Sequence, residues 1–200
     1  MTTHDGDIIR RSLDQRAAFA ELYDRHERTV YRYAARRLGI AHADDIASET
    51  FLVAFSRRAD FVGDDARPWL LGIATRLMQQ HARREAKAWR GMLAADLARV
   101  DLDHFDAVNA RLDAKTTARP LGTAMAKLPA GDRDTILLHT FGDLDYAGIA
   151  AALDIPVGTV RSRLNRARRK LRAAIERAAG PLHTKEEDHG RDLAPAPSAR

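Results

Sequence analysis

Apolar residues recur every three or four positions along most of this chain, which is the spacing of one face of an α-helix. The pattern predicts helices over residues 17–38, 43–58 and 68–90, with Gly39 as the stop of the first and Pro68 in the first turn of the third. Runs of alternating β-branched residues, which would predict strands, are absent from the sequence. The expected fold class is therefore all-α.

The apolar pattern weakens in the middle of the chain and then returns. Residues 93–112 are rich in Ala and Asp and hold few large apolar side chains, so we interpret them as a flexible, acidic linker. Short apolar repeats resume over 113–178, whereas 179–200 carry mixed charges and Pro with almost no apolar anchor. The sequence thus predicts two small helical domains, at 15–92 and 113–178, followed by a disordered tail.

Charged and hydroxyl side chains stand near several predicted helix starts. Asp132 and Thr159 are placed to cap two helices of the second half. Asp44 and Asp45 fall in the first turn of the second predicted helix, where the helix dipole favours anions. Trp69 lies within an apolar run and is expected to belong to the core rather than to a binding surface.

Residues 145–172 contain two helical patterns separated by a tight corner at 154–158. The second pattern has apolar residues spaced by four, three, four and four, at Val160, Leu164, Ala167, Leu171 and Ile175. At about 100° per residue these positions cover one narrow arc, which leaves Arg, Ser and Asn on the other faces. This is the arrangement of a helix-turn-helix, whose second helix enters the DNA major groove.

The positive charge of the chain is concentrated in this last helix. The net charge is only +5, yet residues 158–178 hold eight Arg or Lys against a single Glu. Such a helix fits a polyanion such as nucleic acid, because Lys and Arg neutralise phosphates. The alternative is a solvated basic face on an ordinary helical bundle, since Arg is common throughout the sequence.

The sequence also excludes several classes of protein. It has no Cys, which rules out disulfide scaffolds, thiolate metal sites and Cys nucleophiles. It contains no P-loop, HExxH pair or GxSxG motif, and the acidic run at 101–106 lacks the glycine and terminal Glu of a calcium loop. We therefore expect no catalysis, no cofactor and no metal. No segment resembles a signal peptide or a membrane span, so a cytoplasmic protein is expected.

Several segments resemble the extracytoplasmic-function group of bacterial sigma-70 factors, the RNA polymerase subunits that recognise promoters. Two consecutive segments resemble sigma region four: LPAGDRDTILLHTFGDLDYAGIAAALD and, after it, IPVGTVRSRLNRARRKLR. Region two is resembled by FAELYDRHERTVYRYAARRLG, then ADDIASETFLVAF, then RPWLLGIATRL. Two separate stretches in the order of one family make the resemblance specific, whereas GTVRSRL alone would indicate only a helix-turn-helix.

The resemblance implies a role for each stretch. The residues expected to bind the minus-thirty-five promoter element are Thr159, Arg161, Ser162, Arg163, Asn165, Arg166, Arg168 and Arg169. Those expected to meet the minus-ten element are Phe61, Arg67, Arg76, Gln80, Arg83 and Arg84. Those expected to bind core polymerase are Asp44, Asp45 and Glu49.

The chain departs from the family pattern at a few positions. Ser48 stands where the family usually has Gln, and Gly148 where it commonly has Glu. Arg76 and Gln80 replace the Asn and Asp of many relatives, so the minus-ten sequence preference does not carry over. The family's linker threads the RNA path of the polymerase, where an anionic segment can mimic nucleic acid; the alternative is a plain tether.

The partners that the resemblance implies are core RNA polymerase, promoter DNA and an anti-sigma factor. One rival interpretation is a helix-turn-helix regulator that never engages polymerase, and another is a helical adaptor that binds only proteins. The region-two resemblance argues against the regulator, which would carry a sensor or dimerisation domain there.

Overall fold

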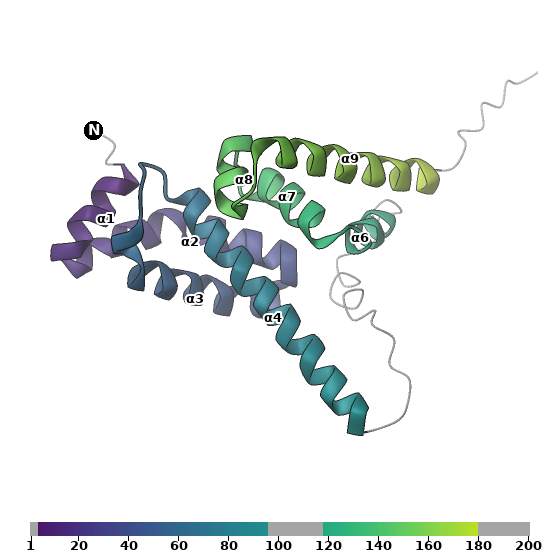
Figure 1. Ribbon diagram of the computed structural model, residues 1–200, viewed down its shortest axis with the longest axis horizontal. Helices are drawn as coiled ribbons and strands as arrows, with labels where there is room; N and C mark the ends of the chain where they lie inside the picture. Colours follow the sequence, from purple (N-terminus) through teal and green to yellow (C-terminus); the bar gives the residue numbers. More distant parts are fainter. Residues whose placement is uncertain (1–3, 96–117, 180–200) are drawn as a thin grey trace, which may run out of the picture.

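The computed structural model describes residues 4–95 and 118–179 of the chain. Every regular element in these two ranges is a helix, which confirms the predicted all-α class (Figure 1). Most of the expected linker, including the acidic run at 101–106, lies outside the described residues, and so does nearly all of the expected tail.

Four α-helices make up the N-terminal domain: α1 (Asp5–Asp14), α2 (Phe19–Leu38), α3 (Ala43–Ser56) and α4 (Arg67–Ala95). Short 3-10 turns at Arg16–Ala18, Ile40–His42 and Arg58–Asp60 connect them. Helices α2, α3 and α4 pack on one another, and α1 packs on α2. The helices predicted at 17–38, 43–58 and 68–90 are confirmed as α2, α3 and α4, whereas α1 was not predicted.

The described part of the C-terminal domain comprises α6 (Ala118–Ala126), α7 (Ala130–Phe141), α8 (Tyr146–Leu153) and α9 (Val157–Ala179). Helix α9 packs on α6, α7 and α8. Its buried stripe is Val160, Leu164 and Ala167, as the apolar spacing predicted. Further along α9, Leu171 is half-buried and Ile175 exposed.

The two caps expected in this domain are wrong. Helix α7 begins at Ala130 and α9 at Val157, so Asp132 and Thr159 lie inside the first turns of these helices. In both cases a proline takes the cap position, and its carbonyl accepts the first helical hydrogen bonds: Pro129 from Arg133, and Pro156 from Thr159 and Val160. The fixed φ of proline suits a helix start and needs no side-chain cap.

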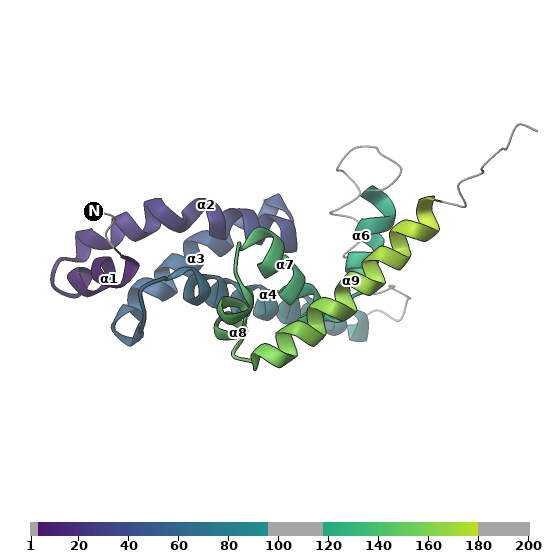
Figure 2. The same ribbon diagram turned by 90° about the horizontal axis from the view of Figure 1, so that it is seen from above.

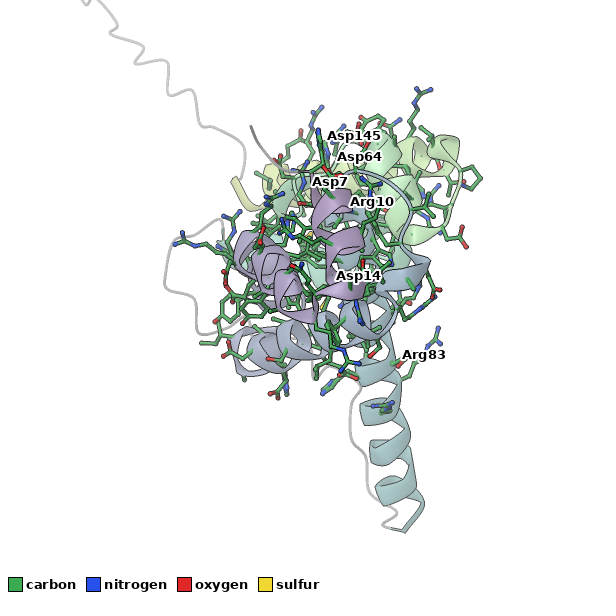
Figure 3. All side chains as sticks on the ribbon, turned by 90° about the vertical axis from the view of Figure 1, so that its left-hand side faces the viewer. Asp7, Arg10, Asp14, Asp64, Arg83 and Asp145 are labelled. Atoms are coloured by element: carbon green, nitrogen blue, oxygen red, sulfur yellow. The ribbon has the colours of Figure 1, made fainter. Side chains whose placement is uncertain are left out.

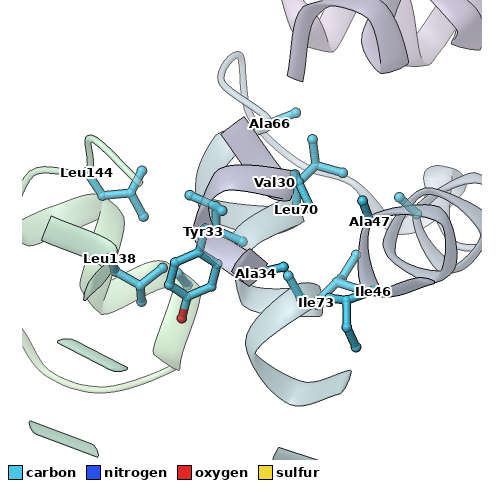
Figure 4. Close-up of a cluster of buried hydrophobic side chains, with 14 of the residues drawn as sticks. Val30, Tyr33, Ala34, Ile46, Ala47, Ala66, Leu70, Ile73, Leu138 and Leu144 are labelled. Atoms are coloured by element: carbon cyan, nitrogen blue, oxygen red, sulfur yellow. The ribbon is translucent and has the colours of Figure 1, made fainter. Parts of the chain in front are cut away.

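The two domains pack against each other, with α8 lying on α4 and α7 on α2 (Figures 1 and 2). Small residues allow the helices to approach closely. A Cβ atom on Gly72 of α4 would lie 2.6 Å from the carbonyl oxygen of Ala152, and one on Gly142 would lie 2.8 Å from Cδ1 of Leu71. Leu138 and Leu144 continue the buried apolar cluster from Tyr33 into the C-terminal domain (Figure 4).

Polar side chains cross this interface at what we call the Asp134 junction, formed by Tyr33, Arg37, Thr75, Gln79 and Asp134. Arg37 Nε donates to Asp134 Oδ1 at 2.7 Å, and Gln79 Nε2 donates to Asp134 Oδ2 at 3.0 Å. One turn earlier on α2 and α4, the hydroxyls of Tyr33 and Thr75 are hydrogen-bonded at 2.9 Å. The side chains of Arg37 and Asp134 are 5% and 2% exposed. Burial, with the nearby negative charge of Asp134, raises the pKa of the Tyr33 phenol, so this hydroxyl stays protonated.

Substituting Gly72→Ala is predicted to separate the two domains. The added Cβ meets a backbone carbonyl, which yields less readily than a flexible side chain. Since the chain has no Cys, dyes attached through Arg32→Cys and Arg172→Cys report the distance between α2 and α9. We expect lower energy transfer in Gly72→Ala. Gly122→Ala is the control, because nothing lies within 4 Å of its Cβ; equal transfer in both variants would contradict the prediction.

Candidate nucleic-acid and polymerase interfaces

The corner before α9 has the geometry of a helix-turn-helix. Asp145 caps α8 by accepting a hydrogen bond from the Gly148 amide at 2.7 Å. Helix α8 ends at Leu153, and the C-cap residue Asp154 adopts a left-handed conformation with φ 54° and ψ 54°. The chain then turns through Pro156 into α9, so the exposed side of α9 projects from the corner.

The outward face of α9 carries polar and basic side chains. At about 100° per residue, Ser162, Asn165 and Arg169 lie opposite the stripe of Val160 and Leu164. All three outward residues are exposed. Arg161 and Arg168, both exposed, lie along one edge of this outward row. Arg163 and Arg166 lie along its other edge.

Two of the arginines expected to contact DNA lie against α7, although the Arg166 side chain remains 46% exposed. Arg163 is half-buried, and its guanidinium lies against Gly131 of α7, 2.9 Å from where a Cβ atom would stand. Arg166 donates from Nε and Nη2 to the two carboxylate oxygens of Asp132, at 3.2 and 3.0 Å. The hydrogen bonds that Arg166 donates to Asp132 raise the pKa of its guanidinium. Both arginines thus help to seat α9 on α7.

The remaining residue expected at the minus-thirty-five element is Thr159. It lies half-buried in the first turn of α9, and its carbonyl accepts a hydrogen bond from the Ser162 hydroxyl at 2.9 Å. A side chain in this place contributes little exposed surface. The helix start still offers backbone amides to an anion, because the first N–H groups of a helix have no partner within it.

Helix α4 presents a second row of polar residues. Arg76, Gln80 and Arg83 are exposed and fall within one sector of α4, and Arg83 is labelled in Figure 3. Arg84 is also exposed and lies to one side of this row. The structure therefore brings together most of the residues expected at the minus-ten element, but it leaves Arg67 at the far end of the helix.

Arg67 begins α4 and is held by its neighbour Asp65. The Arg67 amide donates to Asp65 Oδ1 at 2.9 Å, and Nη2 donates to Oδ2 at 2.8 Å. Partial burial acts to raise the pKa of Asp65, but these hydrogen bonds outweigh it and hold the pKa below its ordinary value. Arg67 also lies 3.8 Å from Asp143 of the C-terminal domain. A phosphate would have to displace these carboxylates to bind Arg67.

The loop before α4 contains Phe61, which was expected at the minus-ten element, and the exposed Val62, which was not predicted. Phe61 is half-buried, and its ring stacks at a tilt on Trp69, with 5.1 Å between the ring centroids. Trp69 is itself half-buried against the core, in keeping with its expected packing role. Val62, at the tip of the loop, is 94% exposed. No periodicity marks a loop residue, so the sequence offered no signal for Val62.

The acidic residues of α3 face away from the core. Asp44, Asp45 and Glu49 are all exposed, and Asp44 and Asp45 occupy the first turn as predicted. Leu52 follows Glu49 at helical spacing on the same face and is 68% exposed. Its apolar side chain was not singled out in the sequence. Leu52 and the acidic side chains of Asp45 and Glu49 therefore share one exposed face of α3.

Two features are absent from the described residues. These residues contain no group of three or more His, Asp or Glu side chains that could hold a metal ion. None of their helices is long and apolar enough to cross a membrane.

Family profiles match both domains. The profile described as "Sigma-70 region 2" matches residues 22–88, and that described as "Sigma-70, region 4" matches residues 118–171. Helix α1 and the first residues of α2 precede the first match, and the last turns of α9 follow the second.

Individual proteins resemble the chain over most of its length. It is 34% identical over 165 residues to the ECF RNA polymerase sigma factor SigL of Mycobacterium tuberculosis, and this match covers 80% of this chain and 90% of SigL. It is 33% identical over 153 residues to the ECF RNA polymerase sigma factor SigE of Mycolicibacterium smegmatis, and this match covers 76% of this chain but only 59% of SigE.

A solved structure shows the same fold. The sigma factor RpoE of Bartonella quintana, in complex with the anti-sigma factor NepR, matches with a TM-score of 0.61 and 20% identity. The match covers 78% of this chain and 96% of that chain.

Substituting Arg166→Ala is predicted to destabilise the C-terminal domain before any DNA is added. Asp132 would then be left as a buried carboxylate without its guanidinium partner. We expect a lower midpoint of thermal unfolding than for Arg168→Ala, which removes an exposed arginine of the same helix. In a double-mutant cycle, Asp132→Ala with Arg166→Ala should cost less than the two single changes together. Strictly additive effects would contradict the pairing.

Proposed function

The chain belongs to the extracytoplasmic-function group of the sigma-70 family, and we propose that its two domains read separate promoter elements for core RNA polymerase. The observation that carries this proposal is the exposed row of Ser162, Asn165 and Arg169, which α9 presents opposite its buried stripe. A second helix of a helix-turn-helix with such a row fits the major groove.

In the proposed minus-thirty-five complex, the residues of α9 divide by position. Arg161, Ser162 and Asn165 near the helix start reach base edges, since recognition helices contact bases through their N-terminal residues. Arg168 and Arg169 lie about two turns further on and neutralise flanking phosphates. Arg163 and Arg166 hold α9 on α7 and so act on DNA through the position of the helix.

The N-terminal domain is proposed to open the minus-ten element and to bind polymerase. Arg76, Gln80 and Arg83 form a polar row on α4 that can follow a single strand, and Arg84 flanks it. The loop at 61–66 supplies Phe61 and the exposed Val62 as apolar contacts for unstacked bases. On α3, Asp44, Asp45 and Glu49 with Leu52 form the proposed polymerase-binding face.

The packed domains must separate for both elements to be read at once. Elements centred near positions minus ten and minus thirty-five lie about 25 base pairs apart, or about 85 Å at 3.4 Å per base pair. In the packed form Gly72 of α4 meets Ala152 of α8 and Gln79 of α4 meets Asp134 of α7, so the domains that carry the two DNA-binding rows are in direct contact. We therefore assign the packed form to the chain away from the promoter.

Two further parts of the proposal rest on the family. An anti-sigma factor is the expected partner of the free chain, and the RpoE structure of like fold is itself a complex with one. Sigma factors are regulatory subunits of the polymerase, so this chain is proposed to supply no catalytic group of its own. It is proposed to act in the cytoplasm, where the polymerase transcribes.

Run-off transcription tests the proposed function. Core polymerase with this chain should yield transcripts with defined start sites from a library of promoter fragments, and core polymerase alone should not. Charge reversal by Asp45→Lys should abolish the transcripts by preventing assembly, while DNA binding through α9 persists. If the chain binds specific DNA but never directs transcription with core polymerase, the helix-turn-helix regulator is the correct interpretation.

Two substitutions on α9 should separate phosphate contacts from base contacts. Arg169→Ala is predicted to weaken binding to all sequences and to reduce the slope of log affinity against log salt by about one. Asn165→Ala is predicted to leave that slope unchanged and to relax the preference at one base pair by about 1–3 kcal/mol. Arg177→Ala, an exposed arginine bonded to its own helix at the Ala173 carbonyl, is the control and should change neither quantity.

A further inference from the structure

Asp5, the first residue of α1, is a buried carboxylate with partners on two other elements. Its side chain is only 6% exposed. Oδ1 accepts a hydrogen bond from Arg25 Nη1 at 2.5 Å, and Oδ2 lies 2.7 Å from His26 Nε2, both on α2. Oδ2 also accepts from the backbone amide of Ala66 at 2.9 Å. Asp5 therefore ties α1 to α2 and to the residue that precedes α4.

The start of α1 is attached to the loop at 61–66 at two further points. The Asp5 amide donates to the Asp64 carbonyl at 3.1 Å. Gly6 is buried against the same loop, and a Cβ atom there would lie 2.4 Å from the Gly63 carbonyl oxygen. Figure 3 looks onto α1, with Asp7, Arg10 and Asp14 labelled along it and Asp64 near its start. The loop thus rests on α1 through backbone contacts that need a glycine.

The contact with Ala66 also has an electrostatic reason. Ala66 immediately precedes α4, and its carbonyl accepts the helical hydrogen bond of Leu70 at 2.9 Å. The amide groups at a helix start lack partners within the helix and carry its positive dipole end, so a carboxylate is favoured there. Asp5 supplies this carboxylate to the start of α4, although it precedes Ala66 by 61 residues in the sequence.

The apolar tip of the loop depends on these attachments. Val62 is 94% exposed and so has little packing of its own to fix its position. On one side of the tip, Phe61 rests on Trp69. On the other side, Gly63, Asp64 and Ala66 are held by α1.

We propose that Asp5 is a positioning residue for minus-ten recognition, which holds the loop at 61–66 and the start of α4 in the geometry that receives unstacked bases. The inference rests on the proposed role of this loop in promoter opening. Asp5 is buried and makes no contact with DNA in the proposed complex, and its hydrogen-bond partners Arg25, His26 and Ala66 do not belong to the polymerase-binding face of α3. Its loss should therefore affect promoter opening and leave polymerase binding intact.

The test compares holoenzymes that carry Asp5→Asn or Gly6→Ala with wild type. Asp5→Asn keeps the shape of the side chain but removes its charge, and Gly6→Ala pushes the loop away while Asp5 remains. Both variants should bind core polymerase as wild type does. Both should form open complexes about tenfold less on a duplex promoter, measured by permanganate reactivity of the minus-ten thymines, and should lose discrimination against base changes in that element.

Asp7→Asn is the matched control. Asp7 lies on the same helix, is exposed, and pairs with Arg10 rather than with the loop, so promoter opening should be unchanged. Phe61→Ala and Val62→Ala test the premise, since they alter the loop and leave Asp5 alone. If neither changes minus-ten discrimination, the role proposed for the loop is wrong.

If the loop variants change discrimination but Asp5→Asn and Gly6→Ala do not, the positioning role of Asp5 is overturned. It is overturned as well if Asp5→Asn lowers polymerase binding and promoter opening in equal proportion, because that is the result of general destabilisation. A selective loss of opening and discrimination in both variants would support the inference.

Discussion

The carboxylate of Asp134 determines how the two domains of this sigma factor meet. It is buried between them and accepts hydrogen bonds from Arg37 on α2 and Gln79 on α4. A buried ion pair gains little net stability, because taking both charges out of water costs about as much as their attraction returns. Removing one partner is far more costly, since the other charge then remains buried alone. The pair therefore acts chiefly by excluding other ways of packing α7 on α2 and α4.

The rest of the interface has the same character. Gly72 lets α4 approach Ala152, and Gly142 lets the end of α7 approach Leu71, at distances that a Cβ atom on either glycine would prevent. At the Asp134 junction, Arg37 Nη1 is buried without a hydrogen-bond partner among the described residues. An interface with exacting geometry and one unsatisfied donor is specific without being maximally stable. This suits the proposal that the two domains hold one arrangement when free and leave it on a promoter.

Much of this architecture is local and could be predicted from the sequence. Helices α2 to α4 and the corner before α9 follow from apolar spacing and from turn residues such as Gly39 and Pro156. The misplaced caps at Asp132 and Thr159 arose because a preceding proline can start a helix without a side-chain cap. Helix α1 was missed although Ile8, Ile9 and Ser12 form its buried face, and its attachment through Asp5 is long-range and leaves no local signal. Pairs such as Arg37 with Asp134, 97 residues apart, leave no local signal at all.

The arginines of α9 show the same limit at the level of function. By charge alone they form a single basic helix, yet they have different tasks once α7 is in place. Arg166 pairs with the buried carboxylate of Asp132, 34 residues earlier, and the guanidinium of Arg163 lies against Gly131. Arg169 projects on the exposed side of the helix. Only charges that remain available to phosphates release counterions when DNA binds. The electrostatic strength of this recognition helix is therefore set by the packing of α7 beneath it as well as by the number of arginines it carries.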